Sequence, residues 1–222
     1  MKKKLQVLSI SLALASATSI LHAESNINAG KQKATSCASC HGEDGNSMVA
    51  TFPKLAQQHS SYLSKQLQAF KDGSRTDPMM SAIALTLSDD DIKDVSAYYA
   101  TQKISENALP DPASDDDAEK PVNEKQDPVQ AMIAKGADLY RNGNLQSEVS
   151  ACIACHGPFG EGNKPASFPA LKSQHADYLI KALTDFKSGA RSNNPENIMH
   201  MIAKKMTDEE IKAVSYRISM MK

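Results

Sequence analysis

The sequence predicts an all-α protein built from two copies of one small helical domain. A 24-residue stretch that starts at Phe52 repeats from Phe168 at a constant offset of 116 residues, and 13 of its 24 aligned pairs are identical. In both copies apolar residues recur at helical spacing, and no run alternates convincingly between apolar and polar residues. The offset is also far longer than the period of a solenoid, about 20 to 50 residues. A duplicated helical domain therefore explains the pattern.

Residues 1–23 have the features of a secretory signal peptide. Lysines at positions 2–4 precede a largely apolar stretch that runs from Leu5 to about Leu21, and the small residue Ala23 suits cleavage. A second candidate cleavage site follows the triplet at 15–17. The apolar stretch is shorter than the about 20 residues that span a bilayer, and Ser and Thr interrupt it. We expect export to the periplasm and no stable membrane insertion after cleavage.

The first domain is predicted to cover residues 24–105 and to contain three helices. A short helix is expected near 29–35. An amphipathic helix follows at 60–73, where Gly73 suits its end and one face carries the apolar residues Tyr62, Leu63, Leu67 and Phe70. A third helix begins after Ser88, its predicted N-cap.

Residues 106–128 are predicted to be a linker between the two domains. They include four prolines and are mostly acidic or small and polar, so they cannot bury enough apolar surface to order themselves. The charge is uneven along the chain: residues 104–128 carry −6, whereas residues 24–103 carry −1 and residues 129–222 carry +3. No basic run is present, which argues against nucleic-acid binding.

The second domain is predicted to cover residues 129–222 with the same helix order. Helices are expected near 134–141 and at 176–189, in register with those of the first copy. The last helix starts after Thr207, and Glu210 three residues later completes a capping-box pattern.

All four cysteines lie in two copies of the pattern Cys-x-x-Cys-His. The pattern is the attachment signature of c-type haem: two thiols add to the two porphyrin vinyl groups, and the adjacent histidine ligates the iron. A domain of about 80 to 95 residues has a modest core, which a disulfide, a metal or a cofactor commonly supplements. We predict two covalently bound haem c groups, with thioether and histidine ligands Cys37, Cys40, His41, Cys152, Cys155 and His156.

Other uses of the cysteines explain the pattern less well. Two disulfides, common in exported proteins, would leave His41 and His156 unexplained. One zinc ion shared by the two cysteine pairs would require both domains to meet at a single atom. A thioredoxin-like redox pair would need a βαβ context, which this sequence does not show.

With these features the chain resembles the cytochrome c4 family, exported dihaem proteins built from two class I cytochrome c domains. The motifs that carry the resemblance are "HGEDGNS", "FPKLA" and "YLSKQL", together with the duplication and a methionine before each capped C-terminal helix. The resemblance covers nearly the whole chain after residue 23. It implies that the domains pack face to face, although the linker here is longer and more acidic. We expect approximate two-fold docking, with the linker looped outside.

The sixth iron ligand is expected to be a methionine, since a soft thioether raises the haem potential. The candidates are Met79 and Met80 in the first copy, and Met199, Met201 and Met206 in the second. Met80 lies eight residues before the predicted N-cap Ser88, and Met199 lies eight residues before the predicted N-cap Thr207. The family pattern implies the same two positions. We therefore predict Met80 and Met199 as axial ligands.

Histidines outside the motifs are the rival ligands. His59 in the first copy and His175 in the second are equivalent, and each lies at the start of a helix. A structural or solvated histidine is a better interpretation there than an iron ligand. His200 has no counterpart in the first copy, so we place it on the surface.

Two prolines and two arginines that the repeat shares have expected roles around the haems. The resemblance to class I cytochromes implies that the carbonyls of Pro53 and Pro169 accept a hydrogen bond from the axial histidines; otherwise each proline simply marks a turn. Arg75 and Arg191 are expected either to pair with haem propionates or to be solvated at a helix end.

A haem with histidine and methionine on its iron has no open position for substrate, so we predict no catalytic residues and no enzyme activity. The family implies an electron shuttle that docks transiently with membrane-bound respiratory complexes: the quinol–cytochrome c oxidoreductase as donor and a terminal oxidase as acceptor. The alternative is a dihaem electron-transfer subunit of a larger dehydrogenase, such as a flavocytochrome. A dihaem peroxidase or thiosulfate dehydrogenase would need an open haem or unusual ligation, sometimes by an extra cysteine, and there is no fifth cysteine.

Overall fold

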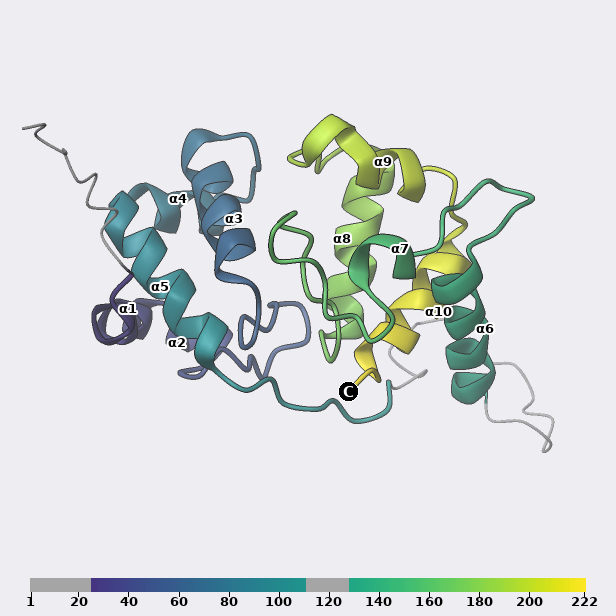
Figure 1. Cartoon of the computed structure of the whole chain (residues 1–222), viewed down its shortest axis with the longest axis horizontal. Helices are drawn as coiled ribbons and strands as arrows, with labels where there is room; N and C mark the ends of the chain where they lie inside the picture. The colour runs from purple at the N-terminus through teal and green to yellow at the C-terminus, as the bar shows by residue number, and fades with distance from the viewer. Residues whose placement is uncertain (1–24, 111–127) are drawn as a thin grey trace, which may run out of the picture.

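The computed structural model describes residues 25–110 and 128–222, so the predicted signal peptide and most of the predicted linker lie outside the described residues. The described residues form ten α-helices and two short 3₁₀ helices, with isolated β-bridges at Asn144–Val149 and Asn163–Phe168 and no strand. Figure 1 shows two helical lobes side by side, one for each copy of the repeat. The prediction of an all-α fold with two similar domains is confirmed.

The first domain packs its N-terminal helix against its C-terminal helix, with the amphipathic helix beside them. Its helices are α1 (Ile27–Lys33), a 3₁₀ turn (Ala34–Ser36), α2 (Ala38–His41), α3 (Ser60–Asp72), α4 (Pro78–Leu85) and α5 (Asp89–Thr101). The buried residues Ala34, Leu63, Val95, Tyr98 and Tyr99 form its core. This core contacts Cys37, so it lies directly beside the first cysteine motif.

The second domain repeats the arrangement with a longer first helix. Its helices are α6 (Pro128–Asn142), α7 (Ile153–His156), α8 (Ala176–Ser188), a 3₁₀ turn (Pro195–Asn197), α9 (Ile198–Ala203) and α10 (Asp208–Ser219). Helix α6 starts at Pro128, six residues before the predicted start. Proline is favoured in a first helical turn, and Val129 is 5% exposed, so burial extends the helix to the edge of the predicted linker.

Capping boxes start the last helix of each domain. The Ser88 and Thr207 side chains accept hydrogen bonds from the backbone N–H groups of Asp91 and Glu210, whose carboxylates accept the reciprocal bonds. The hydrogen bond from the Ser88 N–H, with Lys33 2.9 Å away, lowers the pKa of Asp91 to about 2. Both predicted N-caps are confirmed.

We expect Ser88→Ala to lower the free energy of unfolding by about 1 kcal/mol, because it leaves an N-terminal amide of α5 without its partner. The Asp91 carboxylate contributes stability at neutral pH, since its pKa is lower in the folded state than the ordinary value of 3.8. This contribution is lost as the pH falls from about 4 towards 2. Denaturant unfolding at pH 7 measures the loss in Ser88→Ala. The same measurement on Asp91→Asn checks the pH dependence: this variant should be less stable than the parent at pH 7, and the difference in the free energy of unfolding should be smaller at pH 3.

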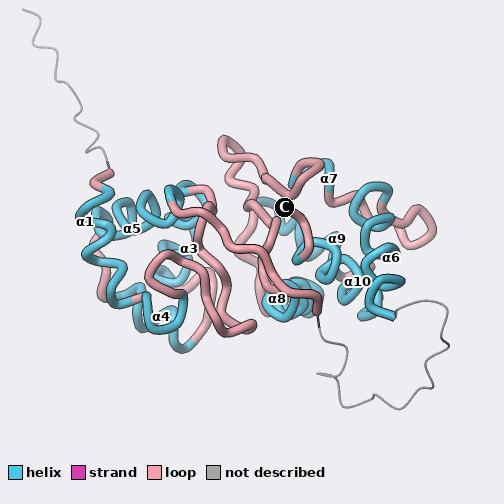
Figure 2. Tube along the Cα trace, turned by 90° about the horizontal axis from the view of Figure 1, so that it is seen from below, coloured by secondary structure: helices cyan, strands magenta, loops and turns pink. Residues whose placement is uncertain are grey.

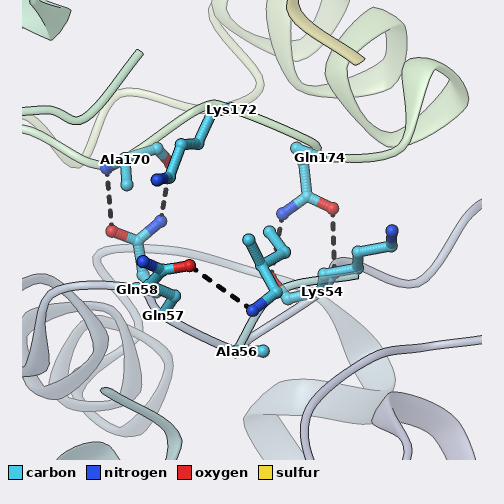
Figure 3. Close-up of a pocket in the computed structure, with 8 residues that line it drawn as sticks. Lys54, Ala56, Gln57, Gln58, Ala170, Lys172 and Gln174 are labelled. Atoms are coloured by element: carbon cyan, nitrogen blue, oxygen red, sulfur yellow. Dashed lines mark hydrogen bonds between the residues drawn. The ribbon is translucent and has the colours of Figure 1, made fainter. Parts of the chain in front are cut away.

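The domains meet in a reciprocal interface (Figure 3). The Gln58 carboxamide donates to the Ala170 carbonyl at 2.8 Å and accepts from the Ala170 N–H at 2.9 Å. Gln174 binds the Lys54 carbonyl and N–H in the same way, at 2.9 and 2.8 Å. Gln58 and Gln174 are equivalent in the repeat, as are Lys54 and Ala170, since each residue is 116 positions from its counterpart. Equivalent surfaces therefore face each other with approximate two-fold symmetry, as isologous interfaces do.

The chain after α5 runs along the second domain rather than away from it (Figure 2). The Asn107 side-chain amide donates to the carbonyls of Ser173, Gln174 and Ser219, and Glu106 forms a 2.7 Å ion pair with Lys222. The expectation that the linker loops outside is therefore wrong for its first residues. No helix within residues 25–110 or 128–222 has the length and apolar character needed to cross a bilayer.

Candidate haem sites

Each cysteine motif lies on a single helical turn. Helices α2 and α7 begin directly after Cys37 and Cys152, and the histidine N–H of each motif donates to the carbonyl of its first cysteine at 3.0 Å. All four cysteines are partly exposed, and no disulfide joins them. The described residues contain no group of three or more His, Cys, Asp or Glu side chains arranged to hold a metal ion. Each motif thus presents its two thiols from one helical turn, as thioether attachment to the two vinyl groups of one haem requires.

The two motif histidines are buried and held by a backbone carbonyl. His41 and His156 are 6% and 8% exposed, and their Nδ1 atoms donate to the carbonyls of Pro53 at 2.9 Å and Pro169 at 3.0 Å. Burial lowers the pKa of both imidazoles and so favours their neutral form. With Nδ1 as the donor, the lone pair is on Nε2, the atom that would ligate iron.

The predicted methionines occupy equivalent places on α4 and α9. The backbone N–H of Met80 donates to Asp77 Oδ1 at 3.0 Å, and that of Met199 donates to Asn194 Oδ1 at 2.9 Å. Both side chains are half-buried. The other three candidates differ: Met79 and Met201 are about half exposed, whereas Met206 is 4% exposed and belongs to the core of the second domain. Met80 and Met199 stay the predicted axial ligands.

The remaining histidines have structural surroundings. His175 Nε2 donates to the Ser47 carbonyl of the first domain at 2.9 Å. His59 Nε2 is buried and has no hydrogen-bond partner among the described residues, and both histidines are half-buried. His200 is half-buried and donates from Nδ1 to the Phe186 carbonyl at 2.7 Å. His200, expected on the surface, is partly covered because α9 packs against α8.

Two arginines lie at the interface between the domains. The Arg191 guanidinium, 7% exposed, donates to the Tyr62 hydroxyl and to Gln66 Oε1, both at 2.9 Å. Arg75 donates to Gln66 Oε1 at 2.8 Å and to the Tyr178 hydroxyl at 3.3 Å. Burial alone would raise the pKa of Tyr178, but the two facing guanidinium charges lower it.

This cluster is short of negative charge. Within the described parts of the chain, no carboxylate forms an ion pair with Arg75 or Arg191, although a buried cation without an anion is costly. Haem propionates would supply that charge, so the residues fit the cofactor implied by the motifs. Solvation, the other expectation for these arginines, is wrong for Arg191.

Comparisons with known proteins agree with this geometry. The cytochrome c family model matches residues 27–103 and again residues 133–219. Cytochrome c4 of Pseudomonas aeruginosa is 40% identical over 97% of this chain and 96% of its own length. The crystal structure of reduced recombinant cytochrome c4 from Pseudomonas stutzeri superposes with a TM-score of 0.78 and 36% identity, over 89% of this chain and 100% of that one.

The chain belongs to the cytochrome c4 family. As a cytochrome c4 it is an electron-transfer protein with two covalently bound haem c groups, one in each of its cytochrome c domains. A further relative, a thiosulfate dehydrogenase electron acceptor of Stutzerimonas stutzeri, is 38% identical over 82% of this chain and 77% of its own length.

The bound haems of a cytochrome c4 supply one-electron chemistry, and the protein supplies orientation and surroundings. Here the Pro53 and Pro169 carbonyls orient the imidazoles, and burial lowers the pKa of both. Sequence reasoning missed the glutamines that bind the peptides after these prolines. Their signal was present, because Gln58 and Gln174 are identical across the repeat.

Proposed function

We propose that this cytochrome c4 is a periplasmic electron carrier with no catalytic centre of its own. Cys37 and Cys40 would hold the first haem, with His41 and Met80 as its axial ligands; Cys152 and Cys155 would hold the second, with His156 and Met199. The observation that carries the proposal is the repeated pair of buried imidazoles whose Nδ1 atoms donate to proline carbonyls. Six-coordinate iron exchanges electrons but leaves no position for substrate.

The proposed acceptor is a terminal oxidase of the respiratory chain, and the proposed donor is the quinol–cytochrome c oxidoreductase complex. Docking to both would be transient, since a carrier must dissociate from each complex after transfer. Weak electron-transfer complexes bury less than about 1,200 Å².

A spectroscopic redox titration of the exported protein tests the haem assignment. We expect two haems per chain, the methionine–iron absorption band and two positive potentials. Low potentials, a missing band or a high-spin haem that binds added ligands would contradict the axial assignment. Oxygen consumption by oxidase-containing membranes, started by adding the reduced protein, tests the acceptor; no oxidation of the protein would reject a terminal oxidase.

A second candidate is an electron-transfer partner of a larger dehydrogenase. It is favoured by the similarity to the protein named as a thiosulfate dehydrogenase electron acceptor. Purification from native periplasm separates the two roles: stable association with a catalytic subunit indicates the dehydrogenase role, and a free dihaem protein indicates the shuttle.

A further inference from the structure

We propose that Gln58 and Gln174 are positioning residues that couple the reduction potential of each haem to docking of the other domain. Each glutamine binds, across the domain interface, the peptide group whose carbonyl accepts the hydrogen bond of an axial histidine. The proposal rests on His41 and His156 being the axial ligands, as proposed above.

The first relay runs from His41 to Gln174. His41 Nδ1 donates to the Pro53 carbonyl at 2.9 Å, and the N–H of the same peptide group, that of Lys54, donates to Gln174 Oε1 at 2.8 Å. Gln174 Nε2 then closes a ring by donating to the Lys54 carbonyl at 2.9 Å. The amide of the second domain is thus two hydrogen bonds and one peptide group away from the histidine of the first haem.

The second relay has the same contacts with the two domains exchanged. His156 Nδ1 donates to the Pro169 carbonyl at 3.0 Å, and the Ala170 N–H of that peptide donates to Gln58 Oε1 at 2.9 Å. Gln58 Nε2 donates to the Ala170 carbonyl at 2.8 Å. Figure 3 shows both carboxamides facing the backbone of the opposite domain.

The surroundings keep both relays dry and fixed. Gln58 is 8% exposed, Gln174 is 6% exposed and Lys54 is 4% exposed. The cavity between them measures about 10 Å³, room for one water molecule at most. Each glutamine Oε1 also accepts from the following backbone N–H, that of His59 or His175, which determines which end of the amide is oxygen.

Conjugation across the peptide group gives the relay its effect. When the N–H of a peptide donates a hydrogen bond, its carbonyl oxygen becomes a stronger acceptor, and a low dielectric strengthens this cooperativity. A stronger acceptor on Nδ1–H makes the ligating imidazole more basic. A more basic imidazole stabilises the oxidised iron, so the bound glutamine lowers the potential of the haem in the other domain.

The two haems should therefore respond crosswise to substitution. We expect Gln174→Met to raise the potential of the haem held by Cys37 and Cys40, and Gln58→Met to raise that of the haem held by Cys152 and Cys155. In the half-reduced protein, the share of electrons on each haem should change severalfold, in opposite directions for the two variants. A residue that only holds the domains together would move both potentials alike.

The experiment is a redox titration of the full-length dihaem protein, with each potential assigned through NMR signals of that haem's own axial methionine. Gln174→Asn is a second variant: it keeps an amide but is one methylene too short to reach Lys54. Ser61→Ala is the matched control, because Ser61 Oγ donates across the interface to the Lys164 carbonyl at 3.0 Å without touching either relay.

A crosswise shift in the Met and Asn variants, with the Ser61 variant unchanged, supports the coupling. Equal shifts of both haems, a shift confined to the mutated domain, or unchanged potentials would overturn it. Two methionine-ligated haems in the unsubstituted protein would still establish the axial sets, so failure of the coupling leaves the carrier proposal standing.

Discussion

Met80→Ala is expected to lower the potential of the first haem by a few tenths of a volt and to leave the second haem unchanged. The thioether is a soft ligand that favours reduced iron, and axial ligands span a range of about 0.8 V. Alanine offers no ligand, so this haem should also become accessible to small molecules. Met199→Ala should do the same to the second haem. Each variant should lose about half of the methionine–iron absorption band.

The neighbouring methionines are the controls for this pair. Met79 and Met201 are about half exposed, so Met79→Ala and Met201→Ala should keep the full band and both potentials. Loss of half of the band in Met79→Ala, with the full band retained in Met80→Ala, would move the first ligand by one residue. Binding of imidazole, followed by optical spectroscopy, reports the opened coordination position independently of the potential.

The fold was predictable because its signals are local. The duplicated amphipathic helix repeats at constant spacing, and Ser88 and Thr207 have their capping partners three residues away. The start of α6 was not predictable, because the acidic, proline-containing stretch before it indicates a linker. Val129 is nevertheless buried. The packing of Asn107 against the end of α10 joins residues 112 apart, which no local pattern reveals.

The candidate haem sites also combine features that local sequence predicts with features that it does not. Its thiols and histidines are adjacent in sequence, so their chemistry was predictable. Identity across the repeat did not predict identical surroundings. The loop between the motif histidine and Phe168 is one residue longer than the loop that ends at Phe52, and only His175 finds a carbonyl in the opposite domain.

Gln66 shows a second break in the symmetry. It accepts from both interface arginines, whereas the equivalent residue of the second copy is Ala182. The repeat predicts two similar sites; the sequence differences between the copies take effect through contacts between the domains, which the sequence alone does not show.

Gly136→Ala is expected to lower the free energy of unfolding by about 3 kcal/mol, as overpacking does at a contact that cannot relax. Helices α6 and α10 cross at this glycine, and an added Cβ would lie 1.9 Å from the Ala213 carbonyl oxygen. Gly30 has the same role between α1 and α5, where the Cβ would lie 2.1 Å from the Asp94 carbonyl oxygen. In both places the obstacle is helix backbone, which cannot rotate away as a side chain can.

Gly73→Ala is the matched control, because an added Cβ would meet nothing within 4 Å there. Its φ of 81° is left-handed, so alanine should cost only about 1 to 2 kcal/mol. Denaturant unfolding, followed through the methionine–iron band, measures the loss. A Gly136→Ala loss no larger than that of Gly73→Ala would show that α6 can move away from α10.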